Sequence, residues 1–176
     1  YEIAPQWTLT GGLRYTKRKR DFSGCTYDFG GETAVWWNAI FGTNLQEGGC
    51  LTFDASFHTI SPALFDELDE DNLSWSGGVN YKVTDDSLLY LRVSKGYKSG
   101  SFPTASVASY TGYAPVKQES VLSYEVGFKA PFANRTVDLS GAVFYYDYKD
   151  KQLRGRLPDP VFGTLDGLVQ IPKSRA

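Results

Sequence analysis

The amino-acid sequence predicts an all-β fold, an antiparallel up-and-down segment of a transmembrane β-barrel. Three observations lead to this class. Apolar and polar residues alternate over several stretches, which is the period of two that a strand with two different faces requires. Aromatic residues make up 15% of the 176 residues, and Trp or Tyr stands at the ends of the apolar faces. Long and short connections also alternate, which a soluble sandwich with Greek-key links gives no reason to expect.

Composition is compatible with this class and excludes others. A net charge of -2 argues against a general nucleic-acid binder, whose basic surface would raise the isoelectric point. The sequence holds no apolar run of about 20 residues and no signal-peptide pattern. A membrane-spanning strand needs only about 9 to 11 residues, half of them polar, so the mean hydropathy of -0.32 is no objection. Met is absent, initiator included, so we expect a fragment or a processed chain.

The first predicted strand covers residues 6–22. Its apolar face carries Trp7, Leu9, Leu13 and Tyr15. From Trp7 to Tyr15 a tilted strand rises on the order of 20 Å, close to the height of about 25 Å of an outer-membrane apolar band. The basic residues 17–20 then break the pattern. They indicate a solvated strand end, or alternatively a contact with charged lipid headgroups.

Residues 23–72 lose the alternation and predict a long, functional connection. Cys25 and Cys50 are expected to form a disulfide in an oxidising compartment, worth roughly 3.5 kcal/mol in the chain-entropy model. The alternative is a pair of unrelated reduced thiols. Ser61 and Pro62 predict a capped helical turn that continues to Leu68.

Two polar features of this connection are interpreted as structural. The acidic residues 66–71 lack the spacing of a calcium loop, so a solvated face is favoured. His58 is the only histidine, and a metal site or a Ser-His-Asp site would depend on it alone. We therefore expect no catalytic residue, no metal ligand and no cofactor.

Two tight hairpins follow. In the first, Trp75, Val79 and Tyr81 are expected to face lipid and Asn80 and Lys82 the lumen, with a turn at residues 84–87. A loop is expected over residues 99–117. The second hairpin joins alternating stretches before and after a turn at residues 131–135, and a third open segment covers residues 149–167.

The connections thus run long, short, long, short, long. In a meander this places long extracellular loops at one end and short periplasmic turns, marked by Asp85 and Asp86, at the other. About six strands are too few to enclose a polar lumen, since single-chain bacterial barrels start at about eight. The chain is therefore expected to be an arc of a larger barrel that does not fold alone in water, because its edges and apolar band would aggregate.

Several stretches resemble the barrel of TonB-dependent outer-membrane receptors. They are WTLTGGLRYT (7–16), LSWSGGVNYKVTDDSLLYLRVSKGYKSGSF (73–102), SYEVGFKA (123–130), AVFYYDYKDKQ (142–152) and IPKSRA (171–176). The resemblance implies a barrel of about 22 strands, a plug domain, and uptake energised by TonB with ExbB and ExbD. Neither plug nor TonB box is recognisable in residues 1–176, which are expected to be a partial barrel domain. The matching positions are structural, so no binding residue is carried over.

The leading hypothesis is part of an active importer in the outer membrane of a Gram-negative bacterium. Its partners would be outer-membrane lipid, TonB and a scarce ligand: a ferric siderophore, haem, cobalamin or a glycan. Candidate ligand contacts are Trp36, Trp37, Phe144, Tyr146 and Tyr148, because aromatic platforms suit sugars or siderophore rings; the alternative is girdle and loop packing. A passive porin or adhesin is a second hypothesis. A barrel hydrolase is a third, although GYKSG (96–100) has lysine where the G-x-S-x-G motif has its central serine.

Overall fold

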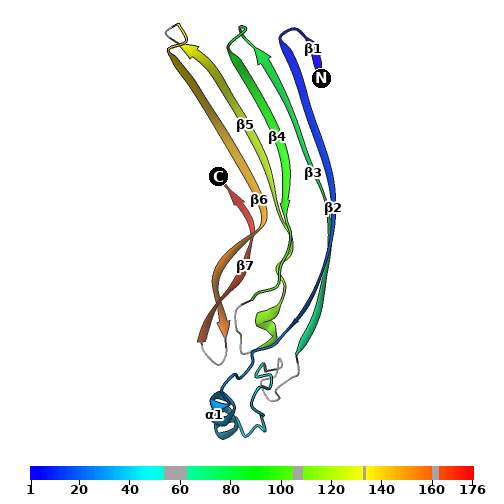
Figure 1. Ribbon diagram of the computed structural model, residues 1–176, viewed down its shortest axis with the longest axis vertical. Helices are drawn as coiled ribbons and strands as arrows, with labels where there is room; N and C mark the ends of the chain where they lie inside the picture. The colour runs from blue at the N-terminus through cyan, green and yellow to red at the C-terminus, as the bar shows by residue number, and fades with distance from the viewer. Residues whose placement is uncertain (54–62, 105–108, 133, 160–162) are drawn as a thin grey trace.

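The computed structural model describes residues 1–53, 63–104, 109–132, 134–159 and 163–176. It is a single antiparallel sheet of seven strands, each paired with its neighbours in sequence, and Figure 1 shows it as a long curved wall. The strands are β1 (Glu2–Ala4), β2 (Trp7–Gly24), β3 (Leu64–Lys82), β4 (Leu88–Lys98), β5 (Glu119–Phe132), β6 (Val137–Asp159) and β7 (Gly163–Arg175). The helices are α1 (Glu32–Phe41) and the 3-10 helix η1 (Tyr110–Tyr113). The all-β, up-and-down prediction is confirmed, with the three-residue β1 as an additional strand.

The turns that join β1 to β2, β3 to β4 and β5 to β6 lie at one end of the sheet (Figure 1). The long β2–β3 and β4–β5 connections lie at the other end, where the β6/β7 ladder also ends, at Asp159 and Gly163. In the turn between β5 and β6, Asn134 and Arg135 adopt positive φ angles of 56° and 66°, a conformation that Asn tolerates better than most residues. Arg135 pairs with Asp86 in the neighbouring turn. The hydrogen bond and the charge of Asp86 raise the pKa of the Arg135 guanidinium above its ordinary value. The two turns are thereby linked to each other.

The pairing register assembles the apolar residues into rows. One row crosses five strands through Leu9, Val79, Leu91, Val126 and Val143. The next row towards the turns contains Trp7, Tyr81, Leu89, Phe128 and Gly141, and the rings of Trp7 and Tyr81 lie 4.5 Å apart. These rows form one continuous apolar face, as the alternation predicts.

This apolar face is uncovered. Val143 is 78% exposed and Leu13 73% exposed. Among the described residues, the buried hydrophobic side chains all lie in the long connections instead: Ala34, Trp37, Leu51, Phe53, Phe102, Tyr113 and Val116. Exposing apolar surface to water costs about 25 cal/mol per Å², so the face requires an apolar environment. In the part of the chain that the structure describes, no helix has the length and hydropathy to cross a membrane.

The helical turn predicted up to Leu68 is wrong, because Leu64–Leu68 belong to β3; Ser61 and Pro62 lie outside the described residues. Pairing with β2 continues as far as Gly24 and Leu64. The acidic residues of β3 lie opposite the basic ones of β2, with Lys19 Nζ 2.7 Å from Glu67 and Lys17 Nζ 3.8 Å from Asp69. Tertiary pairing has outweighed a local capping signal.

The open segment predicted over residues 149–167 is also wrong. β6 extends to Asp159, and β7 returns from Gly163 to pair with its distal half. These residues lie beyond the apolar rows, where the outer face no longer needs apolar side chains. The alternation therefore fades while the backbone ladder continues.

Candidate ligand-binding site

The first long connection forms a small folded unit at the loop end of the sheet. Trp37 of α1 stacks on Phe53 with ring centroids 4.8 Å apart, and both contact Phe41 edge to face. The buried carboxylate of Asp28 accepts a hydrogen bond of 2.9 Å from the backbone N–H of Ala34. It thereby satisfies one of the N–H groups in the first turn of α1 that have no partner within the helix. This helix was not predicted, because its apolar residues lie on both of its faces.

A disulfide between Cys25 and Cys50 closes the base of this unit, with the two Cα atoms 5.6 Å apart. The backbone N–H of Leu51 donates to the carbonyl oxygen of Thr26 beside it at 2.7 Å. The two ends of the connection are thus held together next to the end of β2.

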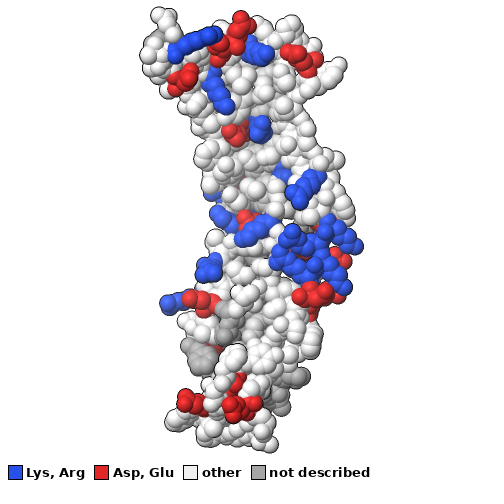
Figure 2. Space-filling model, viewed as in Figure 1, with Lys and Arg blue, Asp and Glu red and all other residues white. Residues whose placement is uncertain are grey.

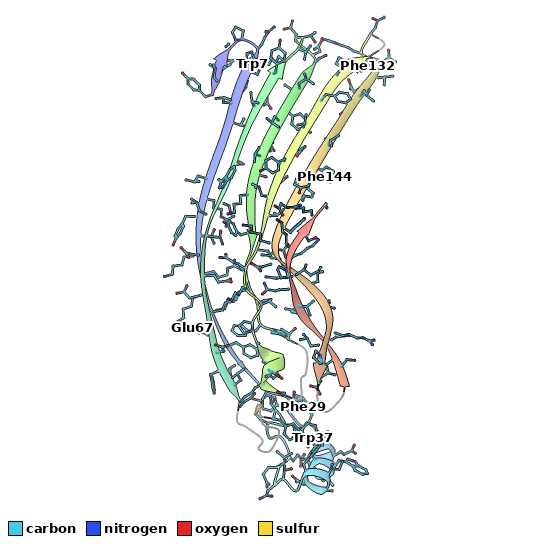
Figure 3. All side chains as sticks on the ribbon, turned by 180° about the vertical axis from the view of Figure 1, so that it is seen from behind. Trp7, Phe29, Trp37, Glu67, Phe132 and Phe144 are labelled. Carbon is cyan, nitrogen blue, oxygen red and sulfur yellow. A yellow bond between two sulfur atoms is a disulfide. The ribbon has the colours of Figure 1, made fainter. Side chains whose placement is uncertain are left out.

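The second long connection packs against the first. Phe102 stacks on Phe22 of β2 at 4.6 Å, and Tyr113 O–H lies 3.2 Å from Thr26 Oγ1. The N–H of Tyr110 donates to the carbonyl oxygen of Phe53 at 3.1 Å. The two connections therefore form one layer at this end of the sheet (Figure 3).

Side-chain hydrogen bonds connect β3 to the β4–β5 connection beyond the end of the β3–β4 backbone ladder. The β3–β4 ladder ends at the pair Trp75 and Lys95. Beyond it, the carboxylate of Glu70 accepts hydrogen bonds from the N–H groups of Gly100 and Gln118, at 2.8 and 2.7 Å. A Cβ on Gly100 would collide with the carbonyl oxygen of Val116, so this close approach requires glycine.

A second joint connects the β4–β5 connection to β6. The buried side-chain amide of Gln152 donates to the carbonyl oxygens of Ser99 and Lys117, at 3.0 and 2.9 Å. The backbone N–H of Gln152 donates to the carboxylate of Glu119. The side-chain amide of Gln170 in β7 also makes two hydrogen bonds with the backbone of Lys117. Its oxygen accepts from the Lys117 N–H, and its NH₂ group donates to the Lys117 carbonyl oxygen. The position of residues 99–104 relative to β6 is therefore fixed by several hydrogen bonds.

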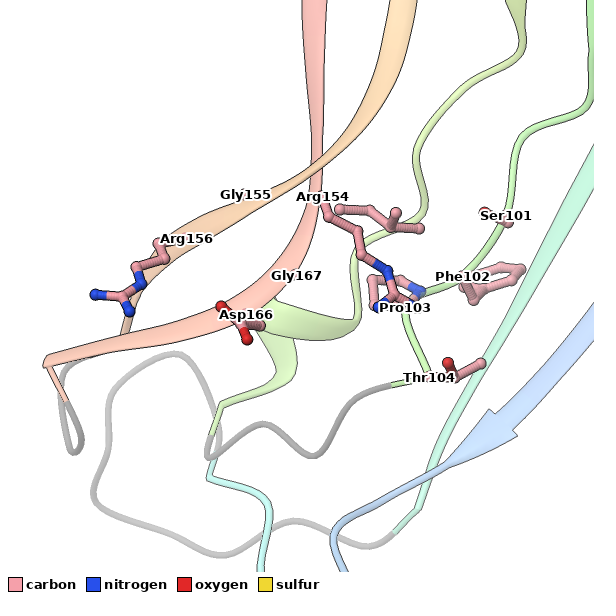
Figure 4. Close-up of a pocket in the computed structure, with 10 residues that line it drawn as sticks. Ser101, Phe102, Pro103, Thr104, Arg154, Gly155, Arg156, Asp166 and Gly167 are labelled. Carbon is pink, nitrogen blue, oxygen red and sulfur yellow. The ribbon is translucent and has the colours of Figure 1, made fainter.

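Between these parts lies a hollow of about 600 Å³ (Figure 4). Residues 101–104 form one wall, and the β6/β7 hairpin forms the other. Phe102, Pro103, Arg154, Arg156, Asp166 and Leu168 are among the residues that line it. Figure 4 shows Arg154 reaching from β6 towards Phe102 and Pro103. The sequence prediction missed this site because it interpreted the β6/β7 hairpin as open chain.

The structure brings three of the predicted contact residues together. Phe144, Tyr146 and Tyr148 form a ladder on one face of β6, with ring centroids 5.0 Å apart for the first pair and 6.1 Å for the second. Lys151 Nζ lies 4.4 Å from the ring of Tyr148. The ladder occupies the face of β6 opposite Val143, where the register neighbours are Glu125, Ser123 and Val121 of β5. This is the polar side of the sheet, and contact of these rings with a ligand stays a prediction.

Trp36 and Trp37 lie apart from this ladder. Figure 3 places Trp37 in the loop unit at one end and Phe144 near the middle of the sheet. Trp37 is only 9% exposed and belongs to the loop core, whereas Trp36 is 67% exposed. The packing alternative therefore applies to Trp37, and Trp36 remains an exposed ring. His58 lies outside the described residues.

The lysine side chains of β2 and the arginine side chains of β6 differ in whether they form ion pairs. Figure 2 shows a group of basic side chains over β2 and β3 with acidic ones beside it, and ion pairs such as Lys19–Glu67 offset their charge. Arg154 and Arg156 have no ion-pair partner among the described residues. Nor do these residues contain a group of three or more His, Cys, Asp or Glu side chains suited to a metal ion.

An antiparallel meander that is apolar on one face and polar on the other, with long connections at one end, is the wall of a membrane β-barrel. The chain belongs to the TonB-dependent receptors: the family model described as "TonB dependent receptor-like, beta-barrel" matches residues 1–176. No curated protein matches it.

Two solved structures share the fold. The ferric yersiniabactin uptake receptor FyuA of Yersinia pestis is 22% identical with a TM-score of 0.55, and the match covers 86% of this chain and 19% of that receptor. The ferric-catecholate import receptor Fiu of E. coli K12, in a closed form, is 18% identical with a TM-score of 0.54, covering 99% and 22%. The chain thus spans about a fifth of the length of each receptor.

Proposed function

We propose that the chain forms part of the wall of an active importer in the outer membrane of a Gram-negative bacterium, energised by TonB with ExbB and ExbD. The family match over all 176 residues carries this proposal. The uncovered apolar face supports it, because outer-membrane lipid supplies the apolar environment that the face requires. In this arrangement the loop end is extracellular and the turns near Asp86 are periplasmic.

We also propose that the imported ligand is a ferric siderophore. The two structural neighbours are a ferric yersiniabactin uptake receptor and a ferric-catecholate import receptor. The ladder of Phe144, Tyr146 and Tyr148 supports the idea, since exposed rings can stack on the rings of such a ligand. A hydrolase receives no comparable support, because its only histidine base would be His58.

Uptake by cells that carry the intact receptor tests the proposal. Radiolabelled iron bound to a tris-catecholate should accumulate in these cells and not in cells that lack the receptor. Accumulation should stop when TonB is deleted or the proton gradient is collapsed. Uptake that persists after collapse of the gradient would instead indicate a passive porin, and unchanged uptake without the receptor would reject the transporter.

A further inference from the structure

We infer that the apolar side of the sheet carries a binding site for the phosphate groups of an outer-leaflet lipid, formed by Lys149 of β6 and Lys173 of β7. The site lies on the opposite side of the wall from the aromatic ladder and away from the hollow. This inference rests on the proposed outer-membrane location. Its ligand is a component of the membrane and not the imported substrate.

The alternation along β6 places Lys149 on the apolar side of the sheet. Lys149 follows Val143 and Tyr145 at even spacing, so it shares the face that carries the uncovered apolar rows. On β7, Lys173 is the register partner of Lys149, and directly paired residues of a ladder share a face. Both lysines are exposed. They therefore point to the side that faces lipid.

The two lysines lie beyond the aromatic end of this face. Tyr145 and its register partner Tyr124 have ring centroids 6.4 Å apart, and the next side chain of the face on β6 is the charged Asp147. Lys149 follows Tyr145 by four residues, which on a tilted strand raises it by roughly 10 Å. Headgroups fill the layer next to the hydrocarbon core. A lysine at this height meets headgroups rather than acyl chains.

The charge of the two lysines is not compensated within the described part of the chain. Lys149 and Lys173 lie directly opposite each other in the ladder, an arrangement of like charges that destabilises a sheet. Neither has an ion-pair partner among the described residues. The nearby Asp147 is instead paired with Arg175, with Nε and Oδ1 3.9 Å apart. An anion placed between the lysines would remove their repulsion.

β2 shows the opposite arrangement at a matching position. Lys19 follows the aromatic Tyr15 by four residues, the same spacing as on β6. Its register partner is Asp69, and its Nζ lies 2.7 Å from the carboxylate of Glu67. There the protein itself neutralises the lysine. On β6 and β7 the described residues offer no such partner, and at a membrane surface lipid phosphates are the abundant anion.

Neighbouring side chains complete a surface that suits a lipid phosphate. Lys95 of β4 lies on the same face, with its Nζ 5.2 Å from the ring of Tyr97. Ser120 stands between Tyr97 and Lys149 in the register. A small hydroxyl between lysines leaves room for a phosphate and can donate a hydrogen bond to it. The apolar rows below would hold the acyl chains of the same molecule, from which a soluble phosphate gains nothing.

The experiment measures lipid binding to the purified intact receptor in detergent by native mass spectrometry. The probes are lipid A and the same lipid after enzymatic removal of its phosphates. The unaltered receptor should retain lipid A in preference to the dephosphorylated form. Lys149→Gln and Lys173→Gln should each weaken lipid A binding about fivefold, the loss expected for one basic residue at an anionic membrane surface. Lys19→Gln removes a paired lysine at the matching position of β2 and should change nothing.

A second variant separates lipid binding from a structural role. Lys173→Glu places opposite charges across the ladder, so it should raise the melting temperature of the receptor in phosphatidylcholine vesicles. The same variant should lose the preference for lipid A. A change in melting temperature with unchanged lipid preference would show that the pair is structural only.

Three further outcomes would overturn the inference. They are equal retention of the two lipids by the unaltered receptor, an unchanged preference in the double variant of Lys149→Gln and Lys173→Gln, and complete displacement of lipid A by inorganic phosphate at equal ionic strength. TonB-dependent iron uptake together with equal retention of the two lipids would leave the import function intact and reject this site alone. A preference for lipid A in a receptor that imports no iron would reject only the import function.

Discussion

Adjacent residues in this chain occupy opposite environments, and Trp36 and Trp37 are the clearest case. They follow one another on α1, so the helix directs them about 100° apart. Trp37 packs between Phe41 and Phe53 in the loop core, while Trp36 is exposed. A sequence motif that treats the pair as one platform misses this difference.

Replacing each ring separately tests this difference. Trp37→Ala should destabilise the loop unit by about 3 kcal/mol or more, because it empties a packed core position. Trp36→Ala should leave its stability unchanged and serves as the matched control. Hydrogen exchange of the amides of residues 25–53 in the intact receptor measures both. Equal protection in the two variants would contradict the assignment of Trp37 to the loop core.

A single strand shows how the two faces of the sheet differ. On β5, Val126 lies in the apolar row between Leu91 and Val143, and Ser123 lies on the polar face between Ser94 and Tyr146. The same alternation is repeated in β2, β3 and β4, and it makes the sheet apolar on one side and polar on the other. A charge should therefore have very different effects at these two positions.

Val126→Arg should destabilise the receptor by about 2–4 kcal/mol, the cost of a basic side chain at the bilayer midplane. Ser123→Arg introduces the same side chain on the polar face and should be tolerated within about 0.5 kcal/mol. Urea unfolding of the intact receptor in lipid vesicles gives both values. The proposed lipid-facing side would be reversed if Ser123→Arg were the more damaging variant.

On the scale of the whole molecule, the long β2–β3 and β4–β5 connections lie at one end, with the β6/β7 ladder ending beside them at Asp159 and Gly163, and the turns between β3 and β4 and between β5 and β6 lie at the other (Figure 1). The proposed orientation predicts that Thr33, exposed on α1, is reached from outside the cell and that Asp85, exposed in a turn, is not. In cells that carry the intact receptor, Thr33→Cys should react with a membrane-impermeant maleimide. Asp85→Cys should react only after the outer membrane is permeabilised. The opposite labelling would invert the orientation.

Much of the fold followed from local pattern. Where one face of a sheet contacts an apolar environment, apolar and polar side chains must alternate along each strand. The central parts of the strands and the face that their apolar residues share were therefore predictable, as around Leu9, Val79, Val126 and Val143. The turns were predictable too, since Asn134 and Asp86 favour reversal. The aromatic ladder on β6 was readable from the same period of two.

Tertiary structure decided the rest, because it depends on which residues meet across the sheet. The acidic residues of β3 extend as a strand only because β2 lies alongside them. β6 and β7 continue beyond the apolar rows because their backbones pair with each other. Trp37 became core when α1 folded onto Phe53. The sequence by itself determined a membrane-barrel wall and its two faces. Only the structure brought Phe102 to Arg154 and Arg156, since no local pattern encodes a contact between a loop and a distant hairpin.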